Sequence, residues 1–314
     1  MWFKNIFRPR PKVVSKRRPA EDGPLFDENF LRRLERLSIQ DQRTLRGNPS
    51  AGEHQSLRHL PASIFSEHRP YTIGDDLRYV DWNAYARHDT VFLKLGEAEQ
   101  DVDVHLLLDA SRSMAWGQPP KLRAAQRMVA ALGYLSLAHS DRLSVFPFGA
   151  APGRPFGPAS GKGRLVELFR YLTAIPLQQQ TDLGQVLQNH ARNYRRGGLL
   201  VLSSDLLVAT GLAEGLRALP PPRWQVLVLH LIDPHEINPR LQGALELEDI
   251  ETGQRLPFAL DEDLLALYRQ NVAAWQENLA LTCARHGAKY AQVLTTWPLE
   301  QRIVPYLRAR RWFL

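Results

Sequence analysis

Short apolar runs alternate with stretches of helical periodicity from about residue 102 to the end of the chain. The first run, from Val104 to Leu108, ends in Asp109 and is typical of a strand buried on both faces. Further strands are expected over residues 143–148, 199–202, 226–232 and 290–294, and helices over residues 121–139, 164–172, 183–194 and 263–286, with a closing helix that contains Ile303 and Leu307. This alternation predicts the α/β class, with a mostly parallel central sheet and helices on both faces.

The residues before this alternation follow other patterns. Phe30, Leu31, Leu34 and Leu37 recur at helical spacing and predict a short amphipathic helix that covers the core. Residues 47–94 lack a helical period, so loops and short strands are expected there, and the Glu-rich residues 245–260 predict an inserted β-hairpin. We therefore expect a basic flexible tail over 1–26, a helix and an extended β segment packed on the core over 27–100, and an α/β domain over 101–314 with its hairpin near 243–260.

The net charge of +7 is confined to the start of the chain. Seven Lys and Arg residues precede the first acidic residue, and the remaining chain is formally neutral. A nucleic-acid partner is therefore not expected. Residues 1–18 also carry Trp2, Phe3, Ile6 and Phe7, so this tail could make a weak contact with an anionic membrane surface. Its prolines favour the alternative, a solvated flexible end.

Two absences from the sequence bear on the compartment. Cys283 is the only cysteine, which excludes an intramolecular disulfide and fits a reducing environment. No apolar run approaches the roughly 20 residues that cross a bilayer, and the N-terminus lacks the pattern of a secretory signal. A cytoplasmic location without a transmembrane segment is therefore expected.

Polar side chains gather where the predicted strands end. Oxygen-bearing residues follow the first strand, open a later helix and end the strand near residue 202; they are Asp109, Ser111, Ser113, Thr181, Asp182 and Asp205. Loops at the carboxyl ends of parallel strands converge, so these side chains are expected to meet. Hydroxyl and carboxylate oxygens suit a hard cation such as Mg²⁺, and few direct carboxylates would leave the cation able to accept another one.

The run from Asp109 to Ser113 resembles the DxSxS signature of the metal-ion-dependent adhesion site in von Willebrand factor A domains. By order and strand context, Thr181 and Asp205 resemble the later threonine and aspartate of that site. The resemblance implies a Rossmann-like von Willebrand factor A fold, in which Ser111, Ser113 and Thr181 coordinate Mg²⁺, Mn²⁺ or Ca²⁺. It implies that Asp109 and Asp205 act mainly through bound waters, and that a partner protein supplies a carboxylate.

A second block, upstream of this signature, is similar to a narrower family. Its residues are Arg69, Pro70, Tyr71, Gly74, Asp75, Asp76, Leu77, Arg78, Asp81, Trp82, Ala86 and Arg87. They resemble the block that precedes the adhesion site in the DUF58 family of von Willebrand factor A-like proteins. Such proteins are typically encoded beside MoxR-type AAA+ ATPases, so the resemblance implies a partner of that kind and a role in complex assembly or protein maturation.

The upstream block has two interpretations. Its mixed Asp and Arg side chains are typical of charge-assisted pairs that hold an extended segment in place. The alternative is a docking surface with Trp82 and Tyr85 as aromatic anchors. Arg112 and Asp182, which neighbour the predicted cation ligands, are further candidates for contact with a partner.

Other chemistries find little support in the sequence. The glycine-rich segment around Lys162 lacks the spacing of a phosphate-binding P-loop, and no GxSxG elbow is present. We therefore expect a non-enzymatic binding adaptor. The alternative is a metal-dependent phosphoester hydrolase in which Asp109 and Asp205 position metal and water. A scaffold without any bound cation is also possible.

Overall fold

The computed structural model describes the greater part of the α/β region and shorter stretches before it. The described residues are 24–35, 60–72, 80–88, 90–96, 102–150, 153–179, 182–207, 211–239, 243–248, 255–298 and 302–303. The predicted contact of residues 1–18 with a membrane surface lies outside them, and so does Leu307 of the expected closing helix. Within the described residues, no helix has both the length and the apolar character required to span a bilayer.

A six-stranded sheet forms the centre of the fold, with the strand order β10-β7-β6-β3-β4-β5. Its strands are β3 (Asp103–Asp109), β4 (Arg142–Phe148), β5 (Phe156–Ala159), β6 (Gly198–Ser204), β7 (Trp224–Ile232) and β10 (Lys289–Leu294). All neighbours pair in parallel except β4 and β5. The mostly parallel sheet predicted from the apolar runs is therefore confirmed, while the short antiparallel edge strand β5 was not predicted.

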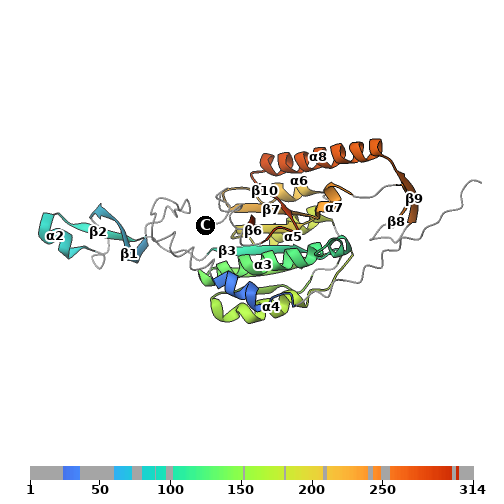
Figure 1. Cartoon of the computed structure of the whole chain (residues 1–314). Coiled ribbons are helices and arrows are strands. Elements are labelled where there is room, and N and C mark those ends of the chain that lie inside the picture. The colour runs from blue at the N-terminus through green and yellow to red at the C-terminus, as the bar shows by residue number, and fades with distance from the viewer. Residues whose placement is uncertain are drawn as a thin grey trace, which may run out of the picture.

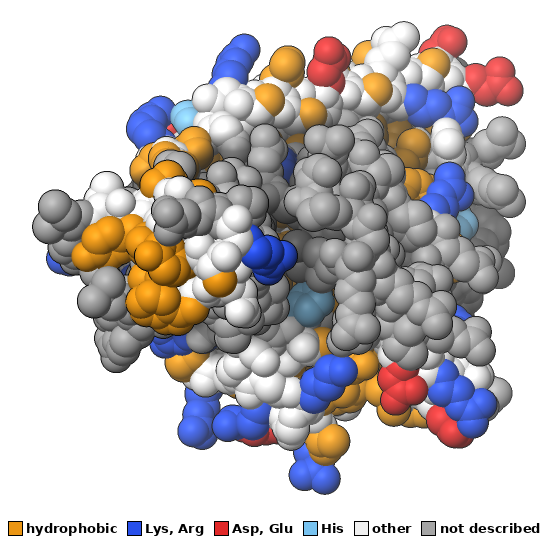
Figure 2. Space-filling model, turned by 90° about the vertical axis from the view of Figure 1, so that its left-hand side faces the viewer, with side chains coloured by type: hydrophobic (Ala, Val, Ile, Leu, Met, Phe, Trp, Pro, Cys, Tyr) orange, Lys and Arg blue, Asp and Glu red, His pale blue; other side chains and the backbone are white. Residues whose placement is uncertain are grey.

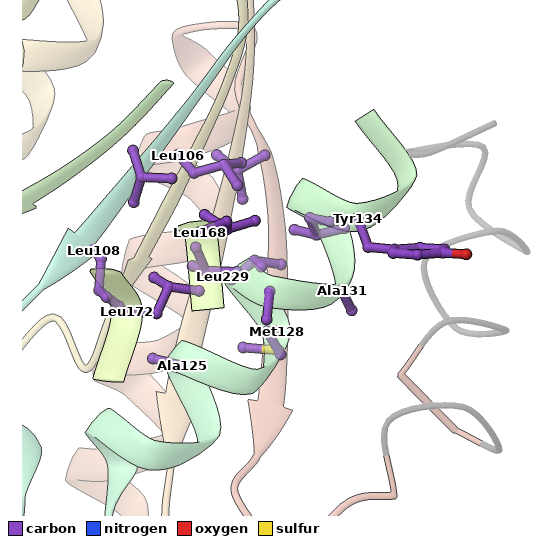
Figure 3. Close-up of a cluster of buried hydrophobic side chains, with 14 of the residues drawn as sticks. Leu106, Leu108, Ala125, Met128, Ala131, Tyr134, Leu168, Leu172 and Leu229 are labelled. Carbon is purple, nitrogen blue, oxygen red and sulfur yellow. The ribbon is translucent and has the colours of Figure 1, made fainter. Parts of the chain in front are cut away.

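Helices cover both faces of this sheet (Figure 1). On one face α3 (Lys121–Ala138) and α4 (Leu165–Thr173) pack on Leu106 and Leu108, as Figure 3 shows. On the other face α5 (Leu183–Asn193), α6 (Leu212–Arg217) and α8 (Glu262–Arg285) enclose Leu107, Leu200 and Leu202. Successive residues of a strand point to opposite faces, so an uninterrupted apolar run fills both cores. The predicted α/β class is confirmed.

The described helical residues 28–35 belong to the first of these cores. Phe30 and Leu34 are fully buried, and Phe26 stacks on Phe169 of α4 with a centroid distance of 4.5 Å. The Asp27 carboxylate starts the helix by accepting a hydrogen bond from the Phe30 amide at 2.8 Å. The apolar face read from the sequence therefore packs against the core.

The upstream segment contains two paired strands and a helix. β1 (Leu60–Pro70) pairs antiparallel with β2 (Phe92–Gly96), and α2 (Trp82–His88) lies between them in sequence. Short strands were expected over 47–94, but α2 was not. Asp81 Oδ1 caps the start of α2 by accepting hydrogen bonds from the Asn83 and Ala84 amides. The helix is too short to show a clear periodicity of hydrophobic residues in the sequence. The boundaries of the three predicted segments stay a prediction.

The structure confirms the inserted hairpin and adds three short helices. β8 (Gly243–Glu248) pairs antiparallel with β9 (Arg255–Leu260), as the Glu-rich segment predicted. The short helix α7 (Pro234–Ile237) follows β7, and single 3-10 turns, η2 (Arg112–Ala115) and η3 (Lys162–Arg164), precede α3 and α4. η2 follows the carboxyl end of β3, and α7 follows the carboxyl end of β7. Both therefore lie at the edge of the sheet that carries the candidate site residues.

A glycine at the start of β6 is required by the close approach of β3. Gly198 has a φ of +140°, and a Cβ there would lie 2.1 Å from the Asp103 carbonyl oxygen. Gly198→Ala is therefore expected to lower the free energy of unfolding by about 1–3 kcal/mol, measured by urea denaturation. Gly163→Ala is the matched control, since its Cβ would meet nothing within 4 Å. Equal stability of the two variants would contradict this account.

Candidate metal and partner-binding site

Asp109 lies at the carboxyl end of β3 and is held at both carboxylate oxygens. Its Oδ1 accepts a hydrogen bond from the Ser111 amide at 2.9 Å, and its Oδ2 accepts one from the Ser204 hydroxyl at 2.5 Å. Ser204 is the last residue of β6, the neighbouring strand. The convergence of the β3 and β6 ends, predicted from the sequence, thus fixes the orientation of this carboxylate.

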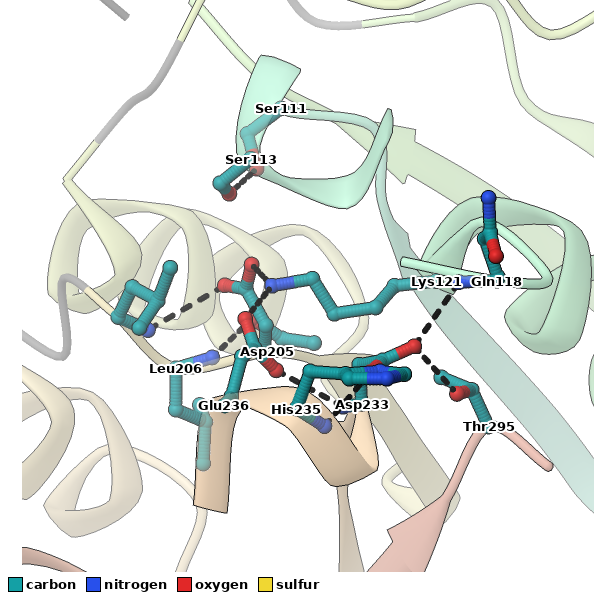
Figure 4. Close-up of polar contacts among 12 residues, drawn as sticks. Ser111, Ser113, Gln118, Lys121, Asp205, Leu206, Asp233, His235, Glu236 and Thr295 are labelled. Carbon is teal, nitrogen blue, oxygen red and sulfur yellow. Dashed lines mark hydrogen bonds and ion pairs between the residues drawn. The ribbon is translucent and has the colours of Figure 1, made fainter. Parts of the chain in front are cut away.

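Ser111 and Ser113 are both buried, and their hydroxyl oxygens lie 2.9 Å apart (Figure 4). Neighbouring ligands of Mg²⁺ in an octahedron with bonds of 2.0–2.1 Å are separated by about 2.9 Å. The same separation permits a hydrogen bond between the two hydroxyls. The serine pair therefore fits two adjacent positions of a small hard cation.

The sequence interpretation missed Lys121, the first residue of α3. Its side chain is fully buried, and Nζ lies 2.7 Å from Asp205 Oδ2 and 2.6 Å from Glu236 Oε1. Figure 4 shows this side chain reaching from α3 to both acids. A lysine is unfavourable at a helix N-terminus, where the macrodipole is positive. That unfavourable position was the one signal that could have indicated a buried acidic partner.

Among the described residues, carboxylates outnumber the ammonium group at this lysine. Asp205 and Glu236 bring two carboxylates against the single ammonium group of Lys121, and the charge of Asp205 also acts on a third carboxylate, that of Asp109. Burial, and then the charge of Asp205, raise the pKa of Asp109 against opposing hydrogen bonds from Ser204 and Ser111. For Lys121, burial alone lowers the pKa, but the charges of Asp205 and Glu236 raise it overall. A divalent cation would supply the two positive charges that the ionised cluster lacks.

The loop after β7 holds Glu236 in place. Asp233 and Glu236 form a capping box at the start of α7, in which Glu236 Oε2 accepts a hydrogen bond from the Asp233 amide at 2.8 Å. Asp233 Oδ2 in turn accepts one from the Gln118 amide, in the loop before α3, at 2.9 Å. Burial tends to raise the pKa of Asp233, but hydrogen bonds from His235 and Gln118 lower it overall. The loop after β7 and the loop before α3 are thereby tied together beside Lys121.

The remaining candidate residues have different outcomes. Thr181 lies outside the described residues, while Asp182 caps α5 by accepting a hydrogen bond from the Gln185 amide at 3.1 Å. Asp205 is buried beside Lys121, and Arg112 is exposed in η2. Among the described residues, no group of three or more His, Cys, Asp or Glu side chains has the arrangement of a metal site. Cation binding would therefore depend on serine hydroxyls as well as carboxylates.

Trp82 and Tyr85 lie on α2, which Figure 1 places away from α3 and α7. The side chains are 63% and 39% exposed, and their rings meet edge to face with centroids 6.3 Å apart. Figure 2, turned so that the side of α2 faces the viewer, shows hydrophobic side chains grouped on that face and basic ones spread around its edge. The structure does not bring these aromatic residues to Asp109, and their contact with a partner stays a prediction.

The sequence profile of the family described as "Protein of unknown function DUF58" matches residues 67–278, which include every predicted site residue. The chain is a member of the DUF58 family. This confirms the resemblance carried by the upstream block. Among curated relatives, the DUF58 protein is 26% identical over 294 residues to the uncharacterized protein Rv1480 of Mycobacterium tuberculosis, and the alignment covers 92% of each chain.

Solved structures also match parts of the chain. Conserved hypothetical protein BatB from Bacteroides thetaiotaomicron matches with a TM-score of 0.41 and 18% identity, over 67% of the DUF58 protein and 98% of BatB. A von Willebrand factor type A protein from Catenulispora acidiphila matches with a TM-score of 0.33 and 12% identity, over 43% of the DUF58 protein and 34% of its own chain. The α/β assignment itself rests on the strand order of the sheet.

Proposed function

We propose that this DUF58 protein is a non-enzymatic adaptor that holds a divalent cation, most suitably Mg²⁺, to bind a carboxylate of a partner protein. The observation that carries the proposal is the buried pair of serine hydroxyls 2.9 Å apart, which matches adjacent Mg²⁺ ligands. Ser111, Ser113 and Thr181 would contact the cation, and Asp109 and Asp205 would act through water. The bound cation would supply a Lewis-acidic site for an incoming acidic side chain.

Hydrogen bonds fix the orientation of the carboxylates of both Asp109 and Asp205. Asp109 accepts hydrogen bonds at both oxygens, from Ser111 and Ser204, and Asp205 does so from Lys121 and Leu207. A carboxylate held in this way is suited to orienting ligands and waters, whereas a general base must be able to accept a proton from a reacting group. The adaptor and the hydrolase alternative both need Asp109 and Asp205 to position a cation and its waters, so phosphoester turnover decides between them.

The expected partner is a MoxR-type AAA+ ATPase, as the family resemblance implies, and the expected location is the cytoplasm. Capture of partners from a native lysate with the tagged full chain is expected to yield such an ATPase in Mg²⁺ and to lose it in EDTA. A partner that is retained equally in EDTA would contradict a role for the cation in recognition.

Calorimetric titration with Mg²⁺ is the direct test of the cation site. Ser111→Ala combined with Ser113→Ala is expected to weaken Mg²⁺ binding by at least about 10- to 100-fold, the scale found for the outer-shell partners of metal ligands. Ser160→Ala is the matched control, because that hydroxyl is exposed and donates to the Ser140 carbonyl away from the site. Unchanged affinity in the double variant would remove the assignment of the serines.

Phosphoester turnover separates the adaptor from the hydrolase. With p-nitrophenyl phosphate and Mg²⁺, the wild-type chain is expected to show no turnover that depends on Asp109. Turnover in the wild type that disappears in Asp109→Ala, with the fold intact by circular dichroism, would establish the hydrolase instead.

A further inference from the structure

Large hydrophobic side chains lie exposed on the loops that carry the candidate site and on helix α8. They are Trp116, Leu177, Leu207 and Tyr268, with exposed fractions of 43%, 46%, 52% and 38%. Each belongs to a different segment: the loop after η2, the loop after α4, the loop after β6, and α8. Exposed hydrophobic residues are ordinary when scattered singly, whereas a group around one polar centre is typical of an interaction site. We name these four residues the apolar rim.

Hydrogen bonds and ring contacts tie each member of the apolar rim to the site. The Trp116 amide donates to the Ser113 carbonyl at 3.2 Å, and its ring centroid lies 5.9 Å from Lys121 Nζ. The Leu207 amide donates to Asp205 Oδ1 at 3.2 Å. These two side chains are therefore placed by the same loops that place the polar groups of the candidate cation site.

Leu177 and Tyr268 are connected in the same manner. Leu177 precedes Gln178, which forms a parallel bridge with Ser111 and whose amide donates to the Ala110 carbonyl at 2.7 Å. The Tyr268 hydroxyl donates to the Glu236 carbonyl at 2.6 Å. Trp116, Leu207 and Tyr268 are thus hydrogen-bonded to residues of the site, and Leu177 is placed by the bonds of its neighbour Gln178.

An apolar groove adjoins the rim at Leu177. Its volume is about 460 Å³, and the residues that give it an apolar lining are Pro24, Leu25, Ala115, Pro120, Leu122 and Leu177. Its polar groups have partners in the protein, because Gln126 donates to the Leu172 carbonyl and Arg123 to the Pro24 carbonyl. The groove is therefore suited to an apolar side chain, and its volume lies in the range of roughly 300–1,000 Å³ that is usual for ligand pockets.

We propose that the apolar rim and the groove bind a partner segment in which an acidic residue is flanked by large aliphatic residues. This inference rests on the proposed function, because the acidic residue would contact the cation. The flanking side chains would pack on Leu207 and in the groove beside Leu177. Charge complementarity favours an acidic segment, since exposed Arg112 lies between the two serines in the sequence and partly exposed Arg123 lines the groove.

Short peptides provide the test, with full-length protein in saturating Mg²⁺. The probes are acetylated and amidated Leu-Asp-Leu, Ser-Asp-Ser and Leu-Asn-Leu, and the readout is the fluorine NMR signal of fluorotryptophan at Trp116, assigned with Trp116→Phe. Leu-Asp-Leu is expected to bind about tenfold more tightly than Ser-Asp-Ser, the effect of burying part of the leucine side chains. Leu-Asn-Leu, which lacks the carboxylate, is expected to cause no shift.

Two rim variants and one control locate the preference. In Leu177→Ser and in Leu207→Ser, the affinity for Leu-Asp-Leu is expected to exceed that for Ser-Asp-Ser by no more than about twofold, instead of about tenfold in the wild type. Both leucines are about half exposed, so serine is compatible with folding. Leu281→Ser changes a leucine of α8 that is 49% exposed but lies outside the rim, and it is expected to bind as the wild type does.

The outcomes distinguish this inference from the proposed function. Equal, Mg²⁺-dependent binding of Leu-Asp-Leu and Ser-Asp-Ser would overturn the role of the rim and leave the cation site standing. A calorimetric titration without Mg²⁺ binding would overturn the proposed function itself.

Two other occupants of the groove have their own signatures, and either would overturn the assignment to a partner. Self-association in sedimentation experiments that Leu207→Ser abolishes would assign the surface to a second copy of the chain. Tighter peptide binding after replacement of Glu21 and Asp22 by serine would assign it to the acidic residues that precede Pro24 in the sequence.

Discussion

Replacement of Lys121 by methionine is expected to lower the free energy of unfolding by about 3–5 kcal/mol, the usual cost of removing one partner from a buried ion pair. The ammonium group is fully buried and lies within 2.7 Å of oxygens of both Asp205 and Glu236. Methionine fills a similar volume but leaves two carboxylates without their cation. Urea denaturation in EDTA measures the loss without interference from divalent cations.

Two further variants separate the charge effect from simple damage to the core. Lys162→Met alters an exposed lysine of η3 and is expected to change stability by less than about 0.5 kcal/mol. Lys121→Met combined with Glu236→Gln is expected to regain part of the loss, because one uncompensated charge is removed. A Lys121→Met variant as stable as the wild type would show that the ammonium group does not hold the acids.

Magnesium provides a link between this prediction and the proposed site. A cation that binds only the folded chain stabilises it in proportion to the logarithm of its concentration. The destabilisation of Lys121→Met is therefore expected to be smaller in millimolar Mg²⁺ than in EDTA, because the ion would replace part of the missing positive charge. The same loss in both solutions would indicate that Mg²⁺ does not reach Asp205.

Acidification is expected to destabilise the protein strongly between about pH 6.5 and pH 4, through histidines buried in their neutral form. His105 of β3 and His190 of α5 are both buried, with Nδ1 of the first 3.1 Å from Nε2 of the second. Burial lowers the pKa of His105 to about 4. Burial, and then the nearby charge of His105, lower the pKa of His190 to about 3.

The sign of the effect follows from proton uptake. Below about pH 6.5 the unfolded chain takes up protons on these histidines and the folded chain does not, so stability falls as the pH is lowered. Each histidine contributes a slope of up to about 1.4 kcal/mol per pH unit until the pH reaches its folded pKa. Urea denaturation at several pH values in EDTA gives the total slope.

A variant at His190 tests this origin of the slope. Phenylalanine is compatible with the surrounding rings of Phe146, Tyr194 and Trp224, and His190→Phe is expected to remove about one histidine's share of the slope. His286→Gln, at the C-terminal end of α8 and partly exposed, is the control. An unchanged slope in His190→Phe would assign the acid sensitivity to other groups.

Local patterns in the sequence predicted most of the α/β region. Buried strands β3, β6 and β7 were visible as apolar runs, and α3, α5 and α8 as helical periods, because residues close in sequence set both patterns. The elements missed include β5, α2, α6, α7 and the 3-10 turns η2 and η3, which are too short for a period to emerge. They are defined by caps and by strand pairing instead, as with Asp81 at the start of α2.

For the candidate site, the sequence by itself determined the group Asp109, Ser111 and Ser113, because these residues share one loop and local geometry brings them together. The rule for parallel sheets predicted Asp205 at the same edge, and in the structure it directly follows β6, the neighbour of β3. Only the tertiary structure decided that Lys121 pairs with Asp205 and Glu236, which lie 84 and 115 residues away in sequence. Contacts over such separations depend on the packing of α3 and α7 at one edge of the sheet, and no local pattern of hydrophobic and polar residues encodes that packing.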